Sequence, residues 1–365
     1  MSHSKPGTPH ATRAVVAYAP EDFRLEEVAV PTPGPGELLV KVEACGICGS
    51  DVKAFKGAAN YWGGPGIPKY MVTPCTIGHE FVGHVAAVGE GAAERHGVDV
   101  GDRVTADQIV PCRECWYCMR GKYWMCAVHN IFGWRNVVNG AWADYMIFPR
   151  NAIVHRVPDE LPIELAVLVE PVSCAVHAVR RARIEFGDLV VISGTGSIGL
   201  AMVGLARLKG AGTVVAVDLS EERLAMAGSF GADVTVNPRL VDAVQAVREL
   251  SDGGIGCDVY IESSGSPKSV LQGLEMLRRL GRFVEFSVFG EPTTVDWSII
   301  GNKKELDIYG SHLGPYAYPV AIDLMARGEL RMDGVVTHFL PLEQWHEALD
   351  LVIDGTRSIK VAIRP

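Results

Sequence analysis

Four cysteines within fifteen residues are the strongest chemical signal in this sequence. They are spaced C-x2-C-x2-C-x7-C along one short segment. Four thiolates can complete a tetrahedral shell around Zn²⁺, and a shell without an open position is structural. The alternative is a disulfide pair, which is disfavoured because no secretory segment precedes the run and thiols stay reduced in a cytosol-like compartment. We therefore predict a structural zinc site held by Cys112, Cys115, Cys118 and Cys126.

A second set of metal-ligating side chains is scattered over three segments. They read C-G-I-C-G-S-D from residue 45, G-H-E from residue 78 and E-P-V-S from residue 170. Each side chain alone has an ordinary explanation as a small buried residue, a core histidine or an acid at a helix N-terminus. Together, one sulfur, one nitrogen and carboxylate oxygens form a mixed shell that suits zinc and leaves room for water or substrate. The candidates are Cys48, His79, Glu80 and Glu170.

A glycine-rich turn indicates a nucleotide site. The strand-like run LVVIS at 189–193 leads directly into G-T-G-S-I-G, and a helix-length segment follows. In this context the pattern is a Rossmann fingerprint, in which the glycines permit the tight turn, the approach of the pyrophosphate and close helix packing. The helix N-terminus supplies N–H donors for the phosphates. The predicted cofactor-binding residues of this turn are Gly194, Gly196, Ile198 and Gly199.

The acid that ends the next strand-like run bears on the choice of cofactor. Asp218 lies nineteen residues after Gly199 and is expected to accept hydrogen bonds from the adenosine ribose. Its charge would repel a 2′-phosphate, which favours NAD over NADP. Arg223 leaves the alternative open, because a nearby arginine can accommodate that phosphate.

The pattern of apolar segments predicts two kinds of architecture. Strand-like stretches broken by Gly and Pro occupy 13–155, for example at 38–42, 81–88 and 145–149. Residues 188–312 instead alternate strands with helix-length segments, which is typical of βαβ units and a parallel sheet. We expect strands at 189–193 and 213–217 with helices at 198–209 and 220–230, and a domain boundary near the helical stretch 170–183.

Composition limits the classes of protein to which the chain can belong. A length of 365 residues favours two domains. The net charge of −9 argues against nucleic acid as a partner, since phosphates require a basic surface. The most apolar run, 161–179, contains two glutamates and two prolines, so we expect no membrane span. Residues 1–12 lack an apolar signal core and predict a polar tail, and the expected location is cytoplasmic.

The combined motifs resemble those of the zinc-dependent medium-chain alcohol and polyol dehydrogenases. The order is a catalytic zinc cysteine, a G-H-E motif, the four-cysteine lobe, an E-P motif and then the nucleotide fold, and the resemblance extends from about residue 13 to 365. It implies that Cys48 and His79 bind the catalytic zinc and that Glu80 is a ligand or a water-holding carboxylate. Glu170 stands where typical alcohol dehydrogenases have cysteine and the sorbitol-dehydrogenase-like branch has glutamate. The resemblance therefore implies a polyol substrate.

The resemblance also implies catalytic roles near the metal. Zinc would act as a Lewis acid on the substrate hydroxyl, and hydride would pass to the nicotinamide. Ser50 is expected to begin the proton relay, with a helix-capping hydroxyl as the alternative. Asp51 is expected to orient His79. The histidine that often continues the relay is replaced by Val52-Lys53, so the exit route stays open, with Glu80 and a water as one alternative.

Two further regions bear on the substrate and the cofactor. The stretch between Asp51 and His79 carries Tyr61 and Trp62, which could form the rim of the substrate pocket or contact a second subunit. The cluster Asn60–Trp62, together with the segment His312–Tyr318, is most similar to the members that oxidise tetritols. The residues expected on the nicotinamide side are Ser287, Val288, Phe289, Ser311, His312 and Leu313.

The sequence thus predicts an α/β protein with a β-rich GroES-like catalytic domain and a Rossmann domain with a doubly wound parallel sheet. The expected boundaries are 1–169 for the catalytic domain with its zinc lobe at 112–126, 170–311 for the NAD-binding domain, and 312–365 for the return to the catalytic domain. The expected function is zinc- and NAD-dependent oxidation of a secondary hydroxyl of a small polyol, with erythritol or L-threitol favoured. One catalytic and one structural zinc per chain and a homotetramer or homodimer are implied. The alternatives are another polyol or alcohol dehydrogenase, an L-threonine dehydrogenase, and an NAD- and zinc-binding protein without turnover.

Overall fold

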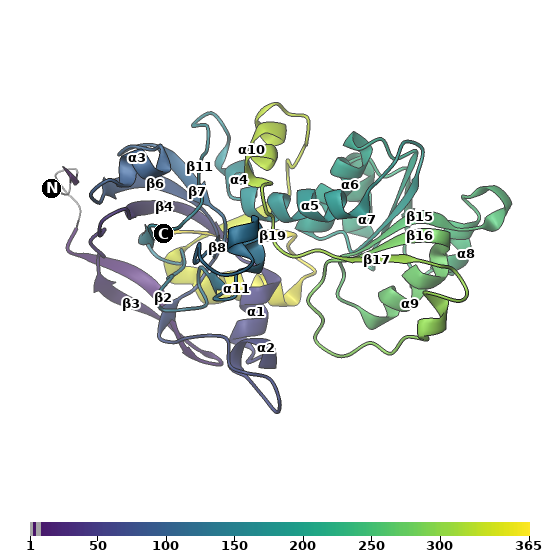
Figure 1. Ribbon diagram of the computed structural model, residues 1–365, viewed down its shortest axis with the longest axis horizontal. Helices are drawn as coiled ribbons and strands as arrows, with labels where there is room; N and C mark the ends of the chain where they lie inside the picture. The colour runs from purple at the N-terminus through teal and green to yellow at the C-terminus, as the bar shows by residue number, and fades with distance from the viewer. Residues whose placement is uncertain (1–2, 5–8) are drawn as a thin grey trace. The chain divides into compact units, whose positions relative to one another are not determined.

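The computed structural model describes residues 3–4 and 9–365 (Figure 1). The chain divides into two compact units. The first comprises Met1–Glu170 and Asp333–Pro365, and the second comprises Pro171–Met332. The chain therefore leaves the first unit at Glu170 and completes it with its last segment.

The first unit is built around an eight-stranded sheet in the order β11-β7-β6-β4-β19-β18, with β1 paired to β6 and β10 paired to β4. The strands predicted at 38–42, 81–88 and 145–149 are confirmed as β4, β6 and β10. The sheet consists of β1 (His3–Ser4), β4 (Leu38–Gly46), β6 (Glu80–Val88), β7 (Arg103–Ala106), β10 (Tyr145–Phe148), β11 (Val154–Arg156), β18 (Val336–Pro341) and β19 (Lys360–Arg364).

Smaller elements complete this unit. Residues 1–2 and 5–8 of the polar tail expected at 1–12 lie outside the described residues, and β2 already begins at Ala11 and pairs with β3. The smaller sheets consist of β2 (Ala11–Ala19), β3 (Asp22–Ala29) and β5 (Cys75–Thr76), and of β8 (Ile109–Val110) and β9 (Asn130–Ile131). The helices are α1 (Gly49–Phe55), α2 (Ala59–Trp62), α3 (Ala92–His96), α4 (Ile163–Ala166) and α11 (Trp345–Asp354), with short 3₁₀ turns at Cys118–Arg120, Tyr123–Met125 and Leu342–Gln344.

The second unit contains a six-stranded parallel sheet in the order β14-β13-β12-β15-β16-β17. Its strand order reverses between β12 and β15, and in Figure 1 the helices α6 and α7 lie on one side of the sheet while α9 lies on the other. The strands are β12 (Leu189–Ser193), β13 (Thr213–Val217), β14 (Val234–Val236), β15 (Cys257–Glu262), β16 (Leu277–Glu285) and β17 (Asp307–Gly310). The helices are α5 (Val169–Ala182), which begins in the first unit, α6 (Ser197–Leu208), α7 (Glu221–Ser229), α8 (Ala243–Arg248), α9 (Pro267–Met276) and α10 (Tyr318–Ala326), with 3₁₀ turns at Asp252–Gly254 and Trp297–Ile299.

Continuous apolar runs form these parallel strands because helices bury both faces of the sheet. All five residues of β12 are buried, and the rings of Tyr260 and Phe283 stack at 5.3 Å between β15 and β16. The alternation predicted from the sequence is confirmed, since α6 and α7 lie within the helices expected at 198–209 and 220–230 to within one residue. In the part of the chain that the structure describes, no helix is both long enough and apolar enough to cross a membrane.

Lys304 closes the C-terminal end of α9. Its ammonium group donates hydrogen bonds to the carbonyls of Leu274 at 2.6 Å, Glu275 at 2.9 Å and Leu277 at 2.7 Å. These carbonyls belong to the last turn of the helix and the start of β16, where no further helical N–H can reach them. A cation at a helix C-terminus is also favoured by the helix dipole. Lys304 thus fastens α9 to the strand that follows it.

We expect Lys304→Met to lower the free energy of unfolding by about 1–3 kcal/mol, because a charged donor to three carbonyls is lost. The midpoint of urea unfolding, followed by circular dichroism, measures this change. Lys303→Met is the matched control, because the neighbouring lysine forms an exposed ion pair with Asp296 and such pairs contribute little. Equal shifts for the two variants would contradict this role of Lys304.

Candidate active site

The strand register of the first unit brings the dispersed metal candidates together. In the pairing of β4 with β6, Gly46 lies opposite Glu80, so Cys48 just beyond β4 faces the start of β6. Ligand atoms of Cys48, His79 and Glu80 all lie within 4.8 Å of one another. His79 and Glu80 are buried and Cys48 is partly buried. One sulfur, one nitrogen and one carboxylate therefore converge on a site that is shielded from water.

Asp51 and Ser50 flank the imidazole of His79. The ring nitrogen Nε2 of His79 lies 3.5 Å from the Ser50 hydroxyl oxygen, and Nδ1 lies 3.7 Å from Asp51 Oδ1. Among the described residues, neither Nδ1 nor Oδ1 has a hydrogen-bond partner, although both atoms are buried. Burial raises the pKa of Asp51 to about 6, although the charge of His79 partly opposes this. Burial lowers the pKa of His79, but Asp51 and Cys48 outweigh burial and raise it to about 10, so this position favours positive charge.

The start of α1 shows what Ser50 and Asp51 each do locally. Cys48 is the N-cap residue, and its backbone N–H donates to the Asp51 carboxylate at 2.8 Å. The sequence left open whether Ser50 begins a proton relay or caps this helix. The structure shows that Asp51 makes the capping contact. The hydroxyl of Ser50 instead forms a hydrogen bond with Tyr61 and faces His79.

Tyr61 and Trp134 form an aromatic wall beside these residues. The ring of Tyr61 lies 4.9 Å from that of Trp134, which lies 5.5 Å from the ring of His79. Tyr61 is buried, and this burial raises the pKa of its phenol. The indole N–H of Trp62 donates to the Ala54 carbonyl at 2.7 Å. Of the two aromatic residues considered for the pocket rim, Tyr61 thus packs against the site. Trp134 was not identified from the sequence, since a single tryptophan carries no local signal.

Glu170 lies outside the group of three ligand residues. It is in the first turn of α5, and its carboxylate accepts a hydrogen bond from the side-chain amide of Gln108. Both residues are buried. Its negative charge nevertheless contributes to the raised pKa of His79, which indicates that the carboxylate is close to the cluster.

Lys360 is a site residue that the sequence analysis missed. Its ammonium group lies 2.7 Å from Oε1 and 2.5 Å from Oε2 of Glu80, and it donates to the Ile47 carbonyl at 3.2 Å. The side chains of Lys360 and Glu80 are 5% and 1% exposed, so both charges are out of water. Strand β19 brings Lys360 here by pairing with β4, where Ile363 lies opposite Cys45. The one available signal was a lysine within the otherwise apolar run I-K-V-A-I near the C-terminus.

The four lobe cysteines also lie together. Their sulfur atoms are within 4.8 Å of one another, and all nine cysteines of the chain are free thiols. Backbone N–H groups point at the sulfurs, with Cys115 N donating to Cys112 Sγ at 3.3 Å and Ala127 N donating to Cys115 Sγ at 3.4 Å. The hydrogen bond from Ala127 is the main reason why the pKa of Cys115 is lowered to about 6. The pKa of Cys126 is also lowered by backbone N–H donors, whereas burial raises the pKa of Cys118 to about 12.

The glycine turn of the second unit has the shape of a phosphate cradle. A Cβ on Gly199 would lie 1.9 Å from the Gly194 carbonyl oxygen, whereas a Cβ on Gly196 would meet nothing within 4 Å. Gly194 also has a positive φ of 95°, which favours glycine. Crowding at Gly194 and Gly199 therefore fixes the turn, while Gly196 leaves open space in front of the N-terminus of α6, which contains Ile198.

Asp218 ties this turn to the end of β13. Its carboxylate accepts hydrogen bonds from Thr195 N at 2.7 Å, Thr195 Oγ1 at 3.0 Å and Ser220 N at 3.0 Å. Arg223 lies in the first turn of α7, where its backbone N–H donates to the Ser220 side chain. The acid predicted to bind ribose thus also orders the loop that surrounds the expected pyrophosphate.

The residues expected on the nicotinamide side follow two neighbouring strands. Ser287, Val288 and Phe289 come after β16, and Ser311, His312 and Leu313 come after β17. All six lie at the carboxyl edge of the sheet, the edge at which the glycine turn follows β12. The structure thereby brings the predicted dinucleotide residues to one edge.

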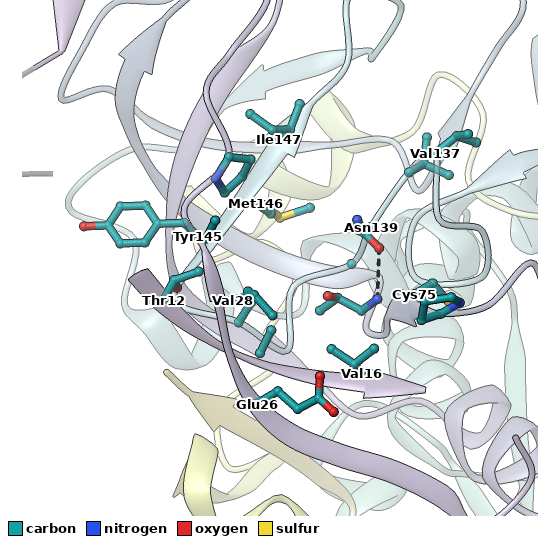
Figure 2. Close-up of a pocket in the computed structure, with 18 of the residues that line it drawn as sticks. Thr12, Val16, Glu26, Val28, Cys75, Val137, Asn139, Tyr145, Met146 and Ile147 are labelled. Atoms are coloured by element: carbon teal, nitrogen blue, oxygen red, sulfur yellow. Dashed lines mark hydrogen bonds between the residues drawn. The ribbon is translucent and has the colours of Figure 1, made fainter. Parts of the chain in front are cut away.

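A separate pocket of about 380 Å³ lies over strands β2 and β3 of the first unit. Figure 2 shows Val16, Val28 and Tyr145 around it, with Asn139 accepting a hydrogen bond from Thr76 N at 2.9 Å. None of the predicted metal or cofactor residues lines this pocket. It is therefore distinct from the candidate active site.

We expect Lys360→Met to lower the free energy of unfolding by about 3–5 kcal/mol, because the Glu80 carboxylate would be left buried without its counter-charge. Chemical unfolding measures the loss. The double variant Lys360→Met with Glu80→Gln removes both charges and should recover part of it. If the double variant is no more stable than the single one, the two charges are not coupled in this way.

Comparison with known proteins agrees with this geometry. Residues 34–159 match the family model of the alcohol dehydrogenase GroES-like domain, and residues 197–327 match that of the zinc-binding dehydrogenases. The chain is 48% identical to an erythritol/L-threitol dehydrogenase of Mycolicibacterium smegmatis over 98% of both chains. It is 35% identical to an L-threonine 3-dehydrogenase of Pyrococcus horikoshii, with 91% of this chain and 92% of the relative covered.

A solved structure gives the same result for the fold. A protein from Sinorhizobium meliloti, described as a zinc-binding dehydrogenase and bound to NADP, superposes with a TM-score of 0.86 at 31% identity, covering 97% of this chain and 99% of that one. The prediction of a GroES-like domain combined with a Rossmann domain is therefore confirmed. The chain belongs to the zinc-binding alcohol dehydrogenase family and is an oxidoreductase that uses zinc and a nicotinamide dinucleotide.

Proposed function

We propose that this enzyme oxidises a secondary hydroxyl of a small polyol to the ketose and transfers the hydride to NAD, with erythritol or L-threitol as favoured substrates. The convergence of Cys48, His79 and Glu80 on one buried point carries the proposal, because it offers a place to bind and polarise a hydroxyl. The substrate class is supported by 48% identity to an erythritol/L-threitol dehydrogenase over nearly the whole chain.

The side chains of the site fit a catalytic zinc ion. One thiolate, one imidazole and a carboxylate are the donor types that zinc prefers in sites with an open position. The group has Cys48 and His79, with Glu80 or Glu170 as the carboxylate, and Asp51 stands ready to accept a hydrogen bond from His79 Nδ1. When bound there, zinc would supply Lewis-acid polarisation of the substrate hydroxyl.

The remaining steps belong to this chain's own residues. Ser50 can accept the proton of the substrate hydroxyl, since a hydroxyl both accepts and donates. Its hydrogen bond to Tyr61 offers the next acceptor where the familiar relay histidine is missing. Lys360 neutralises Glu80, and the aromatic rings of Tyr61 and Trp134 exclude water from the imidazole.

NAD is the proposed cofactor in preference to NADP. The pyrophosphate would lie over Gly196 at the N-terminus of α6, where the backbone can be approached closely. Asp218 stands at the end of β13 with its charge close to the expected ribose, which disfavours a 2′-phosphate. When bound, NAD supplies the hydride acceptor.

A second, structural zinc in the cysteine lobe is also part of the proposal. Four sulfurs within 4.8 Å of one another and N–H groups directed at them support a closed thiolate shell.

Three further proposals rest on the sequence and the family resemblance. They are the domain boundaries 1–169, 170–311 and 312–365, the cytoplasmic location, and a homotetramer or homodimer.

Metal analysis tests the two zinc assignments separately. We expect two zinc ions per wild-type chain by mass spectrometry. Cys48→Ser should retain one and lose at least about 10³-fold in kcat/KM, because the polarising ion is lost. Cys118→Ser should lose the other ion and lower the thermal midpoint, because a structural site contributes directly to folding. Full activity in Cys48→Ser, or a single ion in the wild type, would contradict the assignment.

A substrate panel tests the proposed reaction. NADH production is measured with erythritol, L-threitol, sorbitol, ethanol and L-threonine, and each is repeated with NADP. We expect kcat/KM for a tetritol to exceed that for ethanol and threonine by at least about 10²-fold, since hydroxyl groups of the substrate must be matched by buried polar partners. The alternatives make other predictions: threonine or ethanol as the best substrate indicates the other dehydrogenase classes, and no turnover with any of them indicates a binding protein.

A further inference from the structure

Two consecutive residues connect the candidate active site with the cysteine lobe. Asp107 and Gln108 join β7 to β8, and both are buried. Asp107 contacts Tyr123, which lies between the third and fourth cysteines of the lobe. Gln108 contacts Glu170 in the first turn of α5. The Gln108 side chain is thus directed at the second acid of the candidate active site.

Asp107 fixes the position of this dipeptide. Its Oδ2 accepts a hydrogen bond from the Tyr123 hydroxyl at 2.6 Å, and its Oδ1 lies 2.7 Å from His155 Nε2. The carbonyl of Gln108 also accepts a hydrogen bond from Phe132 N at 2.9 Å. These contacts hold the backbone that carries the Gln108 amide.

The amide of Gln108 in turn holds the Glu170 carboxylate. Its Nε2 donates to Oε1 of Glu170, and the two residues are 3% and 5% exposed. A carboxylate that is out of water needs hydrogen-bond donors, because burying a charge without them is costly. An amide is a neutral donor. Gln108 therefore fixes the carboxylate without cancelling its charge.

Glu170 lies near the three ligand residues but not among them. Ligand atoms of Cys48, His79 and Glu80 lie within 4.8 Å of one another, and Glu170 is not part of this group. Its charge nevertheless acts on His79 and on Lys360, so the carboxylate is close to the group. A negative charge at this place would compete for a bound cation.

A fourth protein ligand would close the site. A zinc ion with four fixed protein ligands is structural, whereas a catalytic ion keeps one position for water or substrate. Cys48, His79 and Glu80 supply three ligands. If Glu170 supplied the fourth, the position for a substrate hydroxyl would be lost. A catalytic site therefore requires that Glu170 be held back, and Gln108 makes the contact that can do so.

We propose that Gln108 holds Glu170 away from the catalytic zinc ion and thereby keeps one coordination position open for the substrate hydroxyl. This inference rests on the proposed catalytic site. Gln108 acts through Glu170 and is a positioning residue rather than a ligand. The anchor at Asp107 supports this role, because a fixed backbone keeps the amide from following the carboxylate to the ion.

Zinc affinity gives the first test, because loss of the contact should strengthen metal binding. Competition with a chromophoric chelator measures the Kd of each of the two expected zinc ions, and Cys48→Ser identifies the ion of the catalytic site. We expect Gln108→Met to bind that ion about tenfold more tightly, since Glu170 no longer gives up a hydrogen bond to reach it. Methionine keeps the length of the side chain but has no N–H donor. A variant that is merely destabilised would bind the ion more weakly.

Access to the open coordination position gives a second test. Co²⁺ replaces zinc in the catalytic site, and its d–d absorption bands shift when added imidazole binds to the ion. We expect imidazole to bind Gln108→Met about tenfold more weakly than the wild type, because Glu170 then occupies the position. A general loss of packing does not produce tighter metal binding together with weaker imidazole binding.

Two further variants show whether the effect passes through Glu170. In a Glu170→Ala background, Gln108→Met should change both Kd values by less than about twofold, because the competing carboxylate is gone. Gln245→Met is the matched control, since the Gln245 amide donates to the Glu249 carboxylate at 2.7 Å on the exposed surface of the second unit. This control should change neither value.

The proposal is overturned if Gln108→Met leaves the zinc Kd within about twofold of the wild-type value or raises it. It is also overturned if imidazole binds that variant as tightly as the wild type, or if Glu170→Ala does not abolish the gain in zinc affinity. Should Gln108→Met fail to fold, Gln108→Leu replaces it under the same criteria. Failure of the proposed catalytic site gives a different result, because the wild type would then bind no ion that Cys48→Ser removes. In that case the catalytic site and the role of Gln108 are both wrong.

Discussion

The buried ion pair between Glu80 and Lys360 is the interaction on which the catalytic unit depends. Burying two charges costs several kcal/mol, and close pairing with additional hydrogen bonds offsets this only when both partners are present. Lys360 meets that condition by contacting both oxygens of Glu80 and the Ile47 carbonyl. The pair therefore ties β19 to the start of β6 and to the loop that leads to Cys48. The last strand of the chain thus helps to define the metal site.

The need to pair buried charges also affects which carboxylate, Glu80 or Glu170, would bind a zinc ion. Glu80 has its ligand atoms beside Cys48 and His79, but both of its oxygens also contact Lys360. Glu170 is bonded to Gln108 and lies outside the group of three. Each acid therefore has a competing partner within the protein. Either acid would therefore have to give up part of its contact with Lys360 or Gln108 in order to bind a zinc ion.

In the second unit, close backbone packing holds the cofactor-binding edge of the sheet in place. Gly199 rests against the Gly194 carbonyl, Gly194 crowds the turn at Ser264, and Glu262 holds that turn. Asp218 adds a link to the loop through Thr195. The edge of the sheet is thus ordered by its own hydrogen bonds, and this preorganisation lowers the entropy cost of binding a dinucleotide.

The sequence by itself determined the features that are local. The cysteine lobe lies within fifteen residues, and the glycine turn lies between a strand and a helix that have clear periodicity, so both could be recognised from spacing. The order of the motifs then led to the correct fold and family. Only the tertiary structure decided the contacts between distant segments. Lys360 lies 280 residues from Glu80, and Trp134 lies beyond the cysteine lobe from His79. The backbone N–H of Ser311 reaches the Glu285 carbonyl only because β16 and β17 are neighbours in the sheet. These contacts depend on which strands pair and in which register, and neither can be read from the spacing of residues along the chain.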